Sequence, residues 1–88
     1  MSDANLDGSR MARLRQGDQT AFAEIVADHQ GRLIGWMFRQ CRDWHAAEDL
    51  AQEVFLRIHG ASAGYIDGGQ FVAWMFRIAR NLLIDNRR

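Results

Sequence analysis

The chain has 88 residues, which is enough for one small domain, and its 48% hydrophobic content is ample for a folded core. Cys41 is the single cysteine, which excludes an internal disulfide and predicts a reducing, cytoplasmic setting, and no apolar run approaches the ~18 residues that a membrane span needs. Net charge is zero, but residues 70–88 hold four Arg and one Asp (+3) whereas residues 1–69 hold seven Arg, seven Asp and three Glu (−3), an asymmetry that predicts one nucleic-acid-binding end.

The first part of the chain is predicted to contain a disordered lead and one long helix. Residues 1–9 are polar and are expected to be disordered, and residues 11–16 are expected to form a short helical turn that ends at Gly17. Asp18 suits the N-cap of a helix over residues 20–41, because its side chain can accept a backbone N–H. Apolar residues recur along this helix at helical spacing: Phe22, Ile25, Val26, Leu33, Trp36 and Met37.

A second helix is predicted over residues 44–59, with Asp43 as its N-cap. Its apolar stripe consists of Ala47, Leu50, Ala51, Val54, Phe55 and Ile58. A separate face carries Asp49, Gln52, Glu53 and Leu56. This face is either a solvated acidic surface or a protein-docking surface, and the apolar Leu56 favours docking.

Neither catalysis nor a bound metal or other cofactor is expected. Asp49 and Glu53 lie four residues apart and could in principle hold a cation or act as acid and base, but no His or Cys joins them at ligand spacing. His29 lies on the apolar stripe of the first long helix. A core or boundary histidine is the favoured interpretation there, because no second His or Cys lies at metal spacing.

A glycine-rich segment precedes the last helix. Residues 60–70 contain four glycines and are predicted to form a flexible loop, followed by a helix over residues 70–87 with an apolar stripe and a basic stripe. The patterns together predict an all-α fold of three main helices without a sheet. The predicted core consists of Phe22, Ile25, Leu33, Trp36, Leu50, Val54, Ile58, Trp74, Ile78 and Leu82.

The loop and the basic stripe together predict a surface for single-stranded nucleic acid. The arginines of the last helix span about 16 Å, a length that can follow several phosphates, with a solvated basic face as the alternative. Tyr65 is the best candidate to stack on an unpaired base beside these cations, whereas core packing is favoured for Phe71 and Trp74. The candidate DNA-binding residues are Tyr65, Gln70, Phe71, Trp74, Arg77, Arg80 and Arg88.

Two segments resemble region 2 of bacterial sigma factors, specifically of the extracytoplasmic-function (ECF) group. They are AEDLAQEVFLRI at residues 47–58 and FVAWMFRIARNLLIDNRR at residues 71–88, and their order around a short loop makes the resemblance specific. Residues 17–39 resemble the first helix of that group. The similarity extends over residues 10–88, which are therefore predicted to be a sigma region 2 domain.

The resemblance implies two partners. The acidic face, with Asp49, Gln52 and Glu53, would dock on the coiled coil of the core RNA polymerase β′ subunit. The loop and the start of the last helix would open and read the −10 promoter element as single-stranded DNA, with Arg77 and Arg80 holding the backbone. An anti-sigma factor is a further partner that ECF proteins commonly have.

Two positions depart from the family pattern. Val72 stands where a charged residue is usual, and Asn86 stands where an aromatic or apolar residue is common, so the promoter sequence stays open. Asn81 and Asp85 match the family's RNxxxD pattern and are interpreted as local hydrogen-bonding residues. The sequence stops at Arg88 without the second DNA-binding domain of the family, and a truncated piece of a longer protein is expected.

An alternative function is a sigma-like module that binds protein without reading DNA, for example as a decoy or a regulator's partner. Such a module needs the acidic face but not a basic helix, so the arginine stripe favours DNA reading. A reader of duplex DNA is disfavoured, because no tight helix-turn-helix spacing is visible.

Overall fold

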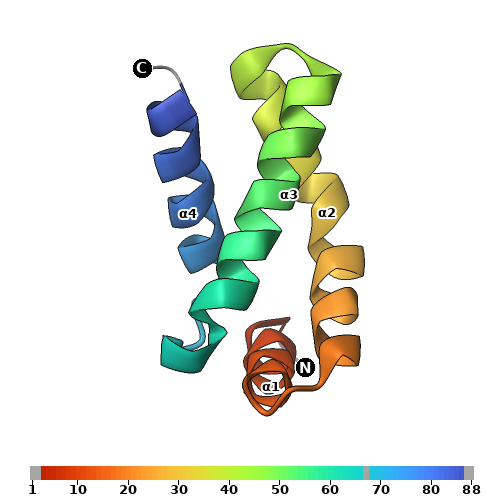
Figure 1. The fold of residues 1–88 in the computed structure, drawn as a ribbon, viewed down its shortest axis with the longest axis vertical. Helices are drawn as coiled ribbons and strands as arrows, with labels where there is room; N and C mark the ends of the chain where they lie inside the picture. Colours follow the sequence, from red (N-terminus) through yellow and green to blue (C-terminus); the bar gives the residue numbers. More distant parts are fainter. Residues whose placement is uncertain (1–2, 67, 87–88) are drawn as a thin grey trace.

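The computed structural model describes residues 3–66 and 68–86, which fold into four α-helices and one short 3-10 turn, with no strand among them (Figure 1). The predicted all-α fold is therefore confirmed. None of the described helices is long and apolar enough to cross a bilayer. The elements in chain order are α1 (Asp3–Arg15), α2 (Gln19–Cys41), α3 (Trp44–Ala61), η1 (Ser62–Gly64) and α4 (Phe71–Asn86).

Helices α2 and α3 form an antiparallel pair, and each begins at its predicted N-cap residue. The Asp18 side chain accepts the backbone N–H of Thr20 at 3.0 Å, and Asp43 accepts that of Ala46 at 3.2 Å. Arg42 ends α2 in a left-handed conformation, with φ of 59°, and its N–H donates to the carbonyl of Phe38. The chain thus reverses within two residues, and α2 and α3 lie side by side (Figure 1).

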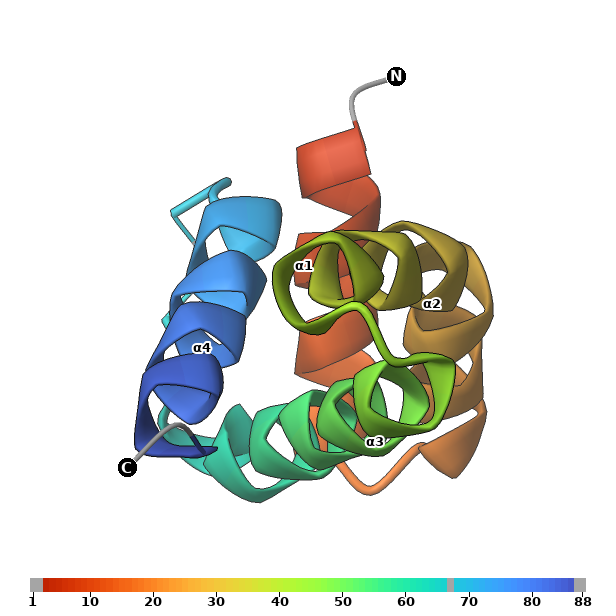
Figure 2. The same cartoon turned by 90° about the horizontal axis from the view of Figure 1, so that it is seen from above.

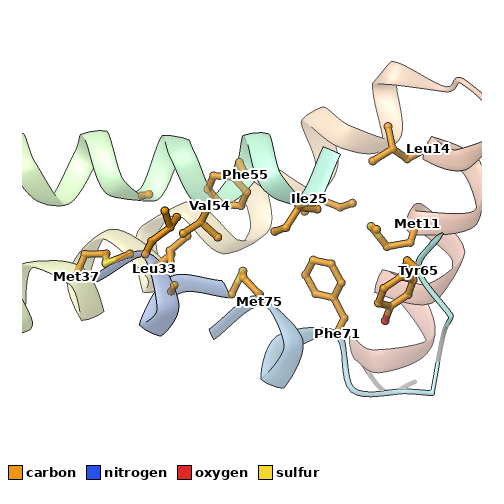
Figure 3. Close-up of a cluster of buried hydrophobic side chains, with 14 of the residues drawn as sticks. Met11, Leu14, Ile25, Leu33, Met37, Val54, Phe55, Tyr65, Phe71 and Met75 are labelled. Atoms are coloured by element: carbon orange, nitrogen blue, oxygen red, sulfur yellow. The ribbon is translucent and has the colours of Figure 1, made fainter. Parts of the chain in front are cut away.

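Helix α4 also packs against α3, and α1 lies at one end of the bundle, where it contacts η1 and α4 (Figures 1 and 2). All four helices contribute to one buried cluster (Figure 3). Five predicted core residues are buried in it: Ile25, Leu33, Val54, Ile58 and Leu82. The other five pack against it half-buried: Phe22, Trp36, Leu50, Trp74 and Ile78.

The N-terminal prediction was wrong. From residue 3 onward, the expected disordered lead and short turn are instead one helix of 13 residues, α1, from Asp3 to Arg15, and residues 1 and 2 lie outside the described part. Its Asp7 is 0% exposed, and Met11 and Leu14 belong to the core. The polar sequence concealed this packing, because the buried stripe of α1 is short and includes Asp7, which pairs with a distant residue, His29 of α2.

The glycine-rich segment is more ordered than predicted. Helix α3 continues through Gly60 to Ala61, and η1 follows it directly, so the irregular connection between η1 and α4 is shorter than the expected loop. Gly69 has a positive φ of 76°, which a side chain rarely tolerates, just before α4 begins. This short connection and η1, together residues 62–70, are called the recognition loop below.

Candidate nucleic-acid interface

A groove lies between the recognition loop and the first two turns of α4. Its volume is about 680 Å³, and its walls come from the end of α3, the loop and α4. Because α4 begins directly after the loop, one face of its first turns borders the groove. The side chains on that face are three and four residues apart in the sequence. The lining residues are Ala61, Gly64, Tyr65, Ile66, Gly68, Gln70, Ala73, Trp74 and Arg77.

Two aromatic residues, Tyr65 and Trp74, line this groove, and Phe71 packs against both. Tyr65 and Trp74 are closest, with ring centroids 4.6 Å apart, and Phe71 contacts both in edge-to-face geometry at 6.3 and 5.8 Å. Tyr65 is 8% exposed and Phe71 is 1% exposed, whereas Trp74 is half-buried. Tyr65 is thus not the free stacking surface that the sequence indicated, and Trp74 offers more ring surface to the groove.

The burial of Phe71 agrees with the packing interpretation rather than with direct contact to a ligand. Its ring lies against His29 of α2, with centroids 5.3 Å apart, so it anchors the first turn of α4 to the core. Gln70, in contrast, is exposed on the groove wall, and its carbonyl accepts the N–H of Trp74 to start α4. Sequence reasoning missed Ile66, which lines the groove and is 88% exposed. An apolar residue inside a glycine-rich loop was the available signal.

The arginines of α4 are exposed and differ in position. Arg77 lines the groove, whereas Arg80 lies one turn further along and does not. Arg88 lies outside the described residues. Within residues 3–66 and 68–86, neither Arg77 nor Arg80 is in an ion pair, whereas Arg10 and Arg13 of α1 each contact two or more carboxylates. The guanidinium groups of Arg77 and Arg80 are both exposed, so each can reach an external anion.

The predicted docking face is exposed on α3, away from the groove. Asp49, Gln52, Glu53 and Leu56 all reach solvent, and Leu56 is 62% exposed. Glu53 makes one weak i,i+4 contact with Arg57, at 3.8 Å. An apolar hollow of about 230 Å³ continues this face onto α2, and it is lined by Phe22, Val26, Gln52, Phe55 and Leu56. A face that mixes acids with apolar surface is suited to a protein partner.

Comparison with known families gives the groove and this face a context. The family model described as sigma-70 region 2 matches residues 25–88, which is more than half of the chain. The chain belongs to the sigma-70 region 2 family. The match includes α3, the recognition loop and α4, so both candidate surfaces lie within it.

The curated relatives of this chain agree with its assignment to the sigma-70 region 2 family. The ECF sigma factor SigW of Bacillus subtilis (strain 168) is 37% identical over 79 residues, which are 90% of this chain and 42% of that protein. CarQ of Myxococcus xanthus is 37% identical over 78 residues (89% and 45%), and SigE of Mycolicibacterium smegmatis is 38% identical over 72 residues (78% and 28%). The chain spans less than half the length of these relatives.

One polar cluster of this sigma region 2 domain lies outside both surfaces. Nε2 of the buried His29 lies 3.0 Å from both carboxylate oxygens of Asp7, and Asp28 lies beside them. The guanidinium of Arg10 contacts Asp7 at 3.2 Å and Asp28 at 2.8 Å, and its hydrogen bond lowers the pKa of the Asp28 carboxyl. Arg10 already supplies the cation that three such ligands would attract, so the cluster joins α1 to α2.

Proposed function

We propose that this chain is the part of a sigma factor that docks on core RNA polymerase and melts and reads the −10 promoter element as single-stranded DNA during transcription initiation. The observation that carries the proposal is the groove, which combines Trp74, an exposed loop and the exposed Arg77 in a sigma-70 region 2 domain. The relatives are named as RNA polymerase sigma factors, which supports the same role here. The site of action is then the cytoplasm.

Two separable terms would hold the DNA strand. Arg77 and Arg80 supply a backbone term without sequence preference, because guanidinium groups meet every phosphate alike. The groove supplies a base term, because an unstacked base can lie on an aromatic ring and hydrogen-bond along its edge, here to a residue such as Gln70. The domain binds and orients the strand and has no catalytic step of its own.

The exposed α3 face supplies the polymerase contact in this proposal. Its carboxylates, Asp49 and Glu53, complement a basic partner, and Leu56 beside the apolar hollow adds a desolvated centre. The family resemblance indicates the coiled coil of the β′ subunit as this partner. An anti-sigma factor that covers either surface would compete with polymerase or with DNA.

The backbone term is tested by the salt dependence of single-stranded DNA binding. If three or four phosphates are contacted, log affinity falls against log salt with a slope of roughly −2 to −3, and Arg77→Ala flattens the slope by about 0.7. Arg57→Ala is the matched control, because it removes one arginine from α3 and leaves α4 intact. Fluorescence anisotropy with a labelled oligonucleotide measures both, with the free chain and with holoenzyme.

The same titrations separate this proposal from a module that binds only protein. Slopes that stay at the wild-type value for both Arg77→Ala and Arg80→Ala, in the free chain and in holoenzyme, would mean that α4 carries a solvated basic face. Core polymerase binding without any oligonucleotide binding would then favour the protein-only alternative.

A further inference from the structure

Helix α1 contacts the back of the recognition loop. Nη1 of Arg15 donates a hydrogen bond to the backbone carbonyl oxygen of Tyr65 at 3.1 Å, across 50 residues of sequence. Met11 and Leu14, on the same helix, are buried in the cluster that also holds Tyr65 and Phe71 (Figure 3). The loop residue that borders the groove is therefore held from behind by a charged donor and by two apolar side chains.

Helix α1 is itself firmly attached to α2. Nη1 and Nη2 of Arg13 meet Oε1 and Oε2 of Glu24 at 3.0 Å each, the paired geometry in which guanidinium binds carboxylate best. At the other end of α1, the buried Asp7 holds the ring of His29, which in turn lies against Phe71 at the start of α4. The recognition loop is thus linked to α1 at two places, through Tyr65 within it and through Phe71 directly after it.

The loop needs such an external support. It is rich in glycine, and Gly64, Gly68 and Gly69 leave many backbone conformations open. A charged donor on a main-chain carbonyl fixes the backbone itself, which a side-chain contact would not do. Tyr65 is the residue at which this donor acts, and its ring lies 4.6 Å from that of Trp74, so the shape of the groove depends on where the Tyr65 backbone is held.

We propose that Arg15 is a positioning residue of the DNA groove, which sets the recognition loop from behind so that the ring of Trp74 stays open to an unpaired base. The inference rests on the proposed function for the identity of the ligand. It assigns a binding role to α1, which precedes residue 25, where the match to the family model begins. Arg15 does not line the groove, so it acts through Tyr65 and not by touching DNA.

The test compares Arg15→Met, which keeps an unbranched stem but removes the donor, with Arg13→Met as a matched control. Both variants remove one guanidinium from α1, but among the described residues the guanidinium of Arg13 pairs with carboxylates of α2 and its cap and not with the loop. Amide hydrogen exchange of the 88-residue chain is the first readout. We expect exchange in residues 62–70 to become about tenfold faster in Arg15→Met. In Arg13→Met the exchange should accelerate by a clearly smaller factor, because Arg13 attaches α1 to α2 but does not donate to the Tyr65 carbonyl. Arg15→Lys should recover part of the protection.

The second readout is base binding. The wild-type chain and its holoenzyme are titrated with an oligothymidine strand of about 12 nucleotides and with the same strand carrying abasic sites at its centre. We expect the wild type to prefer the intact strand by about tenfold, since that is the usual size of one stacking contact. Arg15→Met should lose at least half of this preference while its salt slope stays unchanged. If Arg15 only stabilised the fold, the preference for the intact strand and the salt slope would change together.

Three results would overturn the proposal. One is loop exchange at the wild-type rate in Arg15→Met. Another is faster exchange with an unchanged preference for the intact strand, and the third is an equal loss of preference in Arg13→Met. A wild-type chain without any preference for bases would instead remove the base term of the proposed function, and the exchange rates would still decide whether Arg15 orders the loop.

Discussion

Tyr65 shows how a residue at a candidate site can serve packing first. The sequence placed an aromatic ring on a glycine-rich loop, where a free stacking surface is a reasonable prediction. The ring is instead enclosed by Phe71, Trp74 and the α1 side chains, at 8% exposure. Burial of an aromatic ring in a small domain contributes substantially to its stability. The groove and the core therefore share one wall.

This shared wall predicts that Tyr65→Ala affects folding and binding together. Truncation of a buried aromatic should lower the free energy of unfolding by about 3 kcal/mol, and the base preference should fall because the groove loses its wall. Tyr65→Phe keeps the ring and should cost much less on both counts. Urea unfolding and oligonucleotide titration at equal folded fractions measure the two effects. An alanine variant of wild-type stability would show that the ring is not packed in solution.

At the scale of elements, three helices were predictable from sequence and one was not. The apolar stripes of α2, α3 and α4 repeat at helical spacing, and Asp18 and Asp43 mark two of their starts, so their positions followed from local physics. Helix α1 is held in part by Asp7 meeting His29, 22 residues away, and such a polar pair has no local signature. The groove was predictable only in part, because the burial of Tyr65 depends on α1.

The attachment of α1 to α2 should make the fold sensitive to acid. The guanidinium of Arg13 lowers the pKa of the Glu24 carboxyl below its ordinary value of 4.5, and it lowers the pKa of Asp18 as well. A carboxyl whose pKa is lower in the folded chain stabilises the fold above its unfolded pKa, and that contribution is lost as pH falls through the folded pKa. The Arg13–Glu24 pair thus stabilises the domain at neutral pH and not in strong acid.

Glu24→Gln tests this dependence. We expect the midpoint of thermal unfolding to change less with pH below about 4.5 in the variant than in the wild type, because glutamine cannot be protonated there. Arg13→Met should flatten the same pH range, since it removes the other half of the pair. Thermal unfolding followed by circular dichroism across this range provides the measurement, and a wild-type pH profile in Glu24→Gln would contradict the assignment.

The outer face of α3 yields a prediction about docking. Glu53→Arg should weaken binding to core polymerase by about tenfold, because the reversed charge opposes a basic partner. Thermal stability should hardly change, since the 3.8 Å contact with Arg57 is exposed. Glu48→Arg is the control on the same helix: five residues away, its side chain points about 140° around the axis from Glu53. If both variants bind polymerase like the wild type, the acidic face is only solvated.

At the scale of the whole molecule, the arginines that underlie the uneven charge fall into two groups with different surroundings. Arg10 and Arg13 of α1 pair with Asp7, Asp18, Glu24 and Asp28 and hold two helices together. Those described on α4 face solvent without an ion-pair partner among the described residues. A count of charges along the chain cannot distinguish the two groups, because pairing is a property of the fold. In the proposed function, the second group contacts the DNA backbone.

The separation of the two surfaces predicts additivity. Glu53 lies on the outer face of α3 and Arg77 in the groove at the start of α4, and within residues 3–66 and 68–86 they share no ion-pair or groove partner. In holoenzyme, the free-energy costs of Glu53→Arg and Arg77→Ala should therefore add within about 0.5 kcal/mol in the double variant. Arg77→Ala combined with Trp74→Ala is the contrasting pair, because both side chains line the groove, and its costs should deviate from additivity by more than this. Titration of promoter DNA with each variant holoenzyme measures both pairs. Strong coupling between Glu53 and Arg77 would mean that polymerase docking reshapes the groove, and the domain would then transmit a conformational change from one surface to the other.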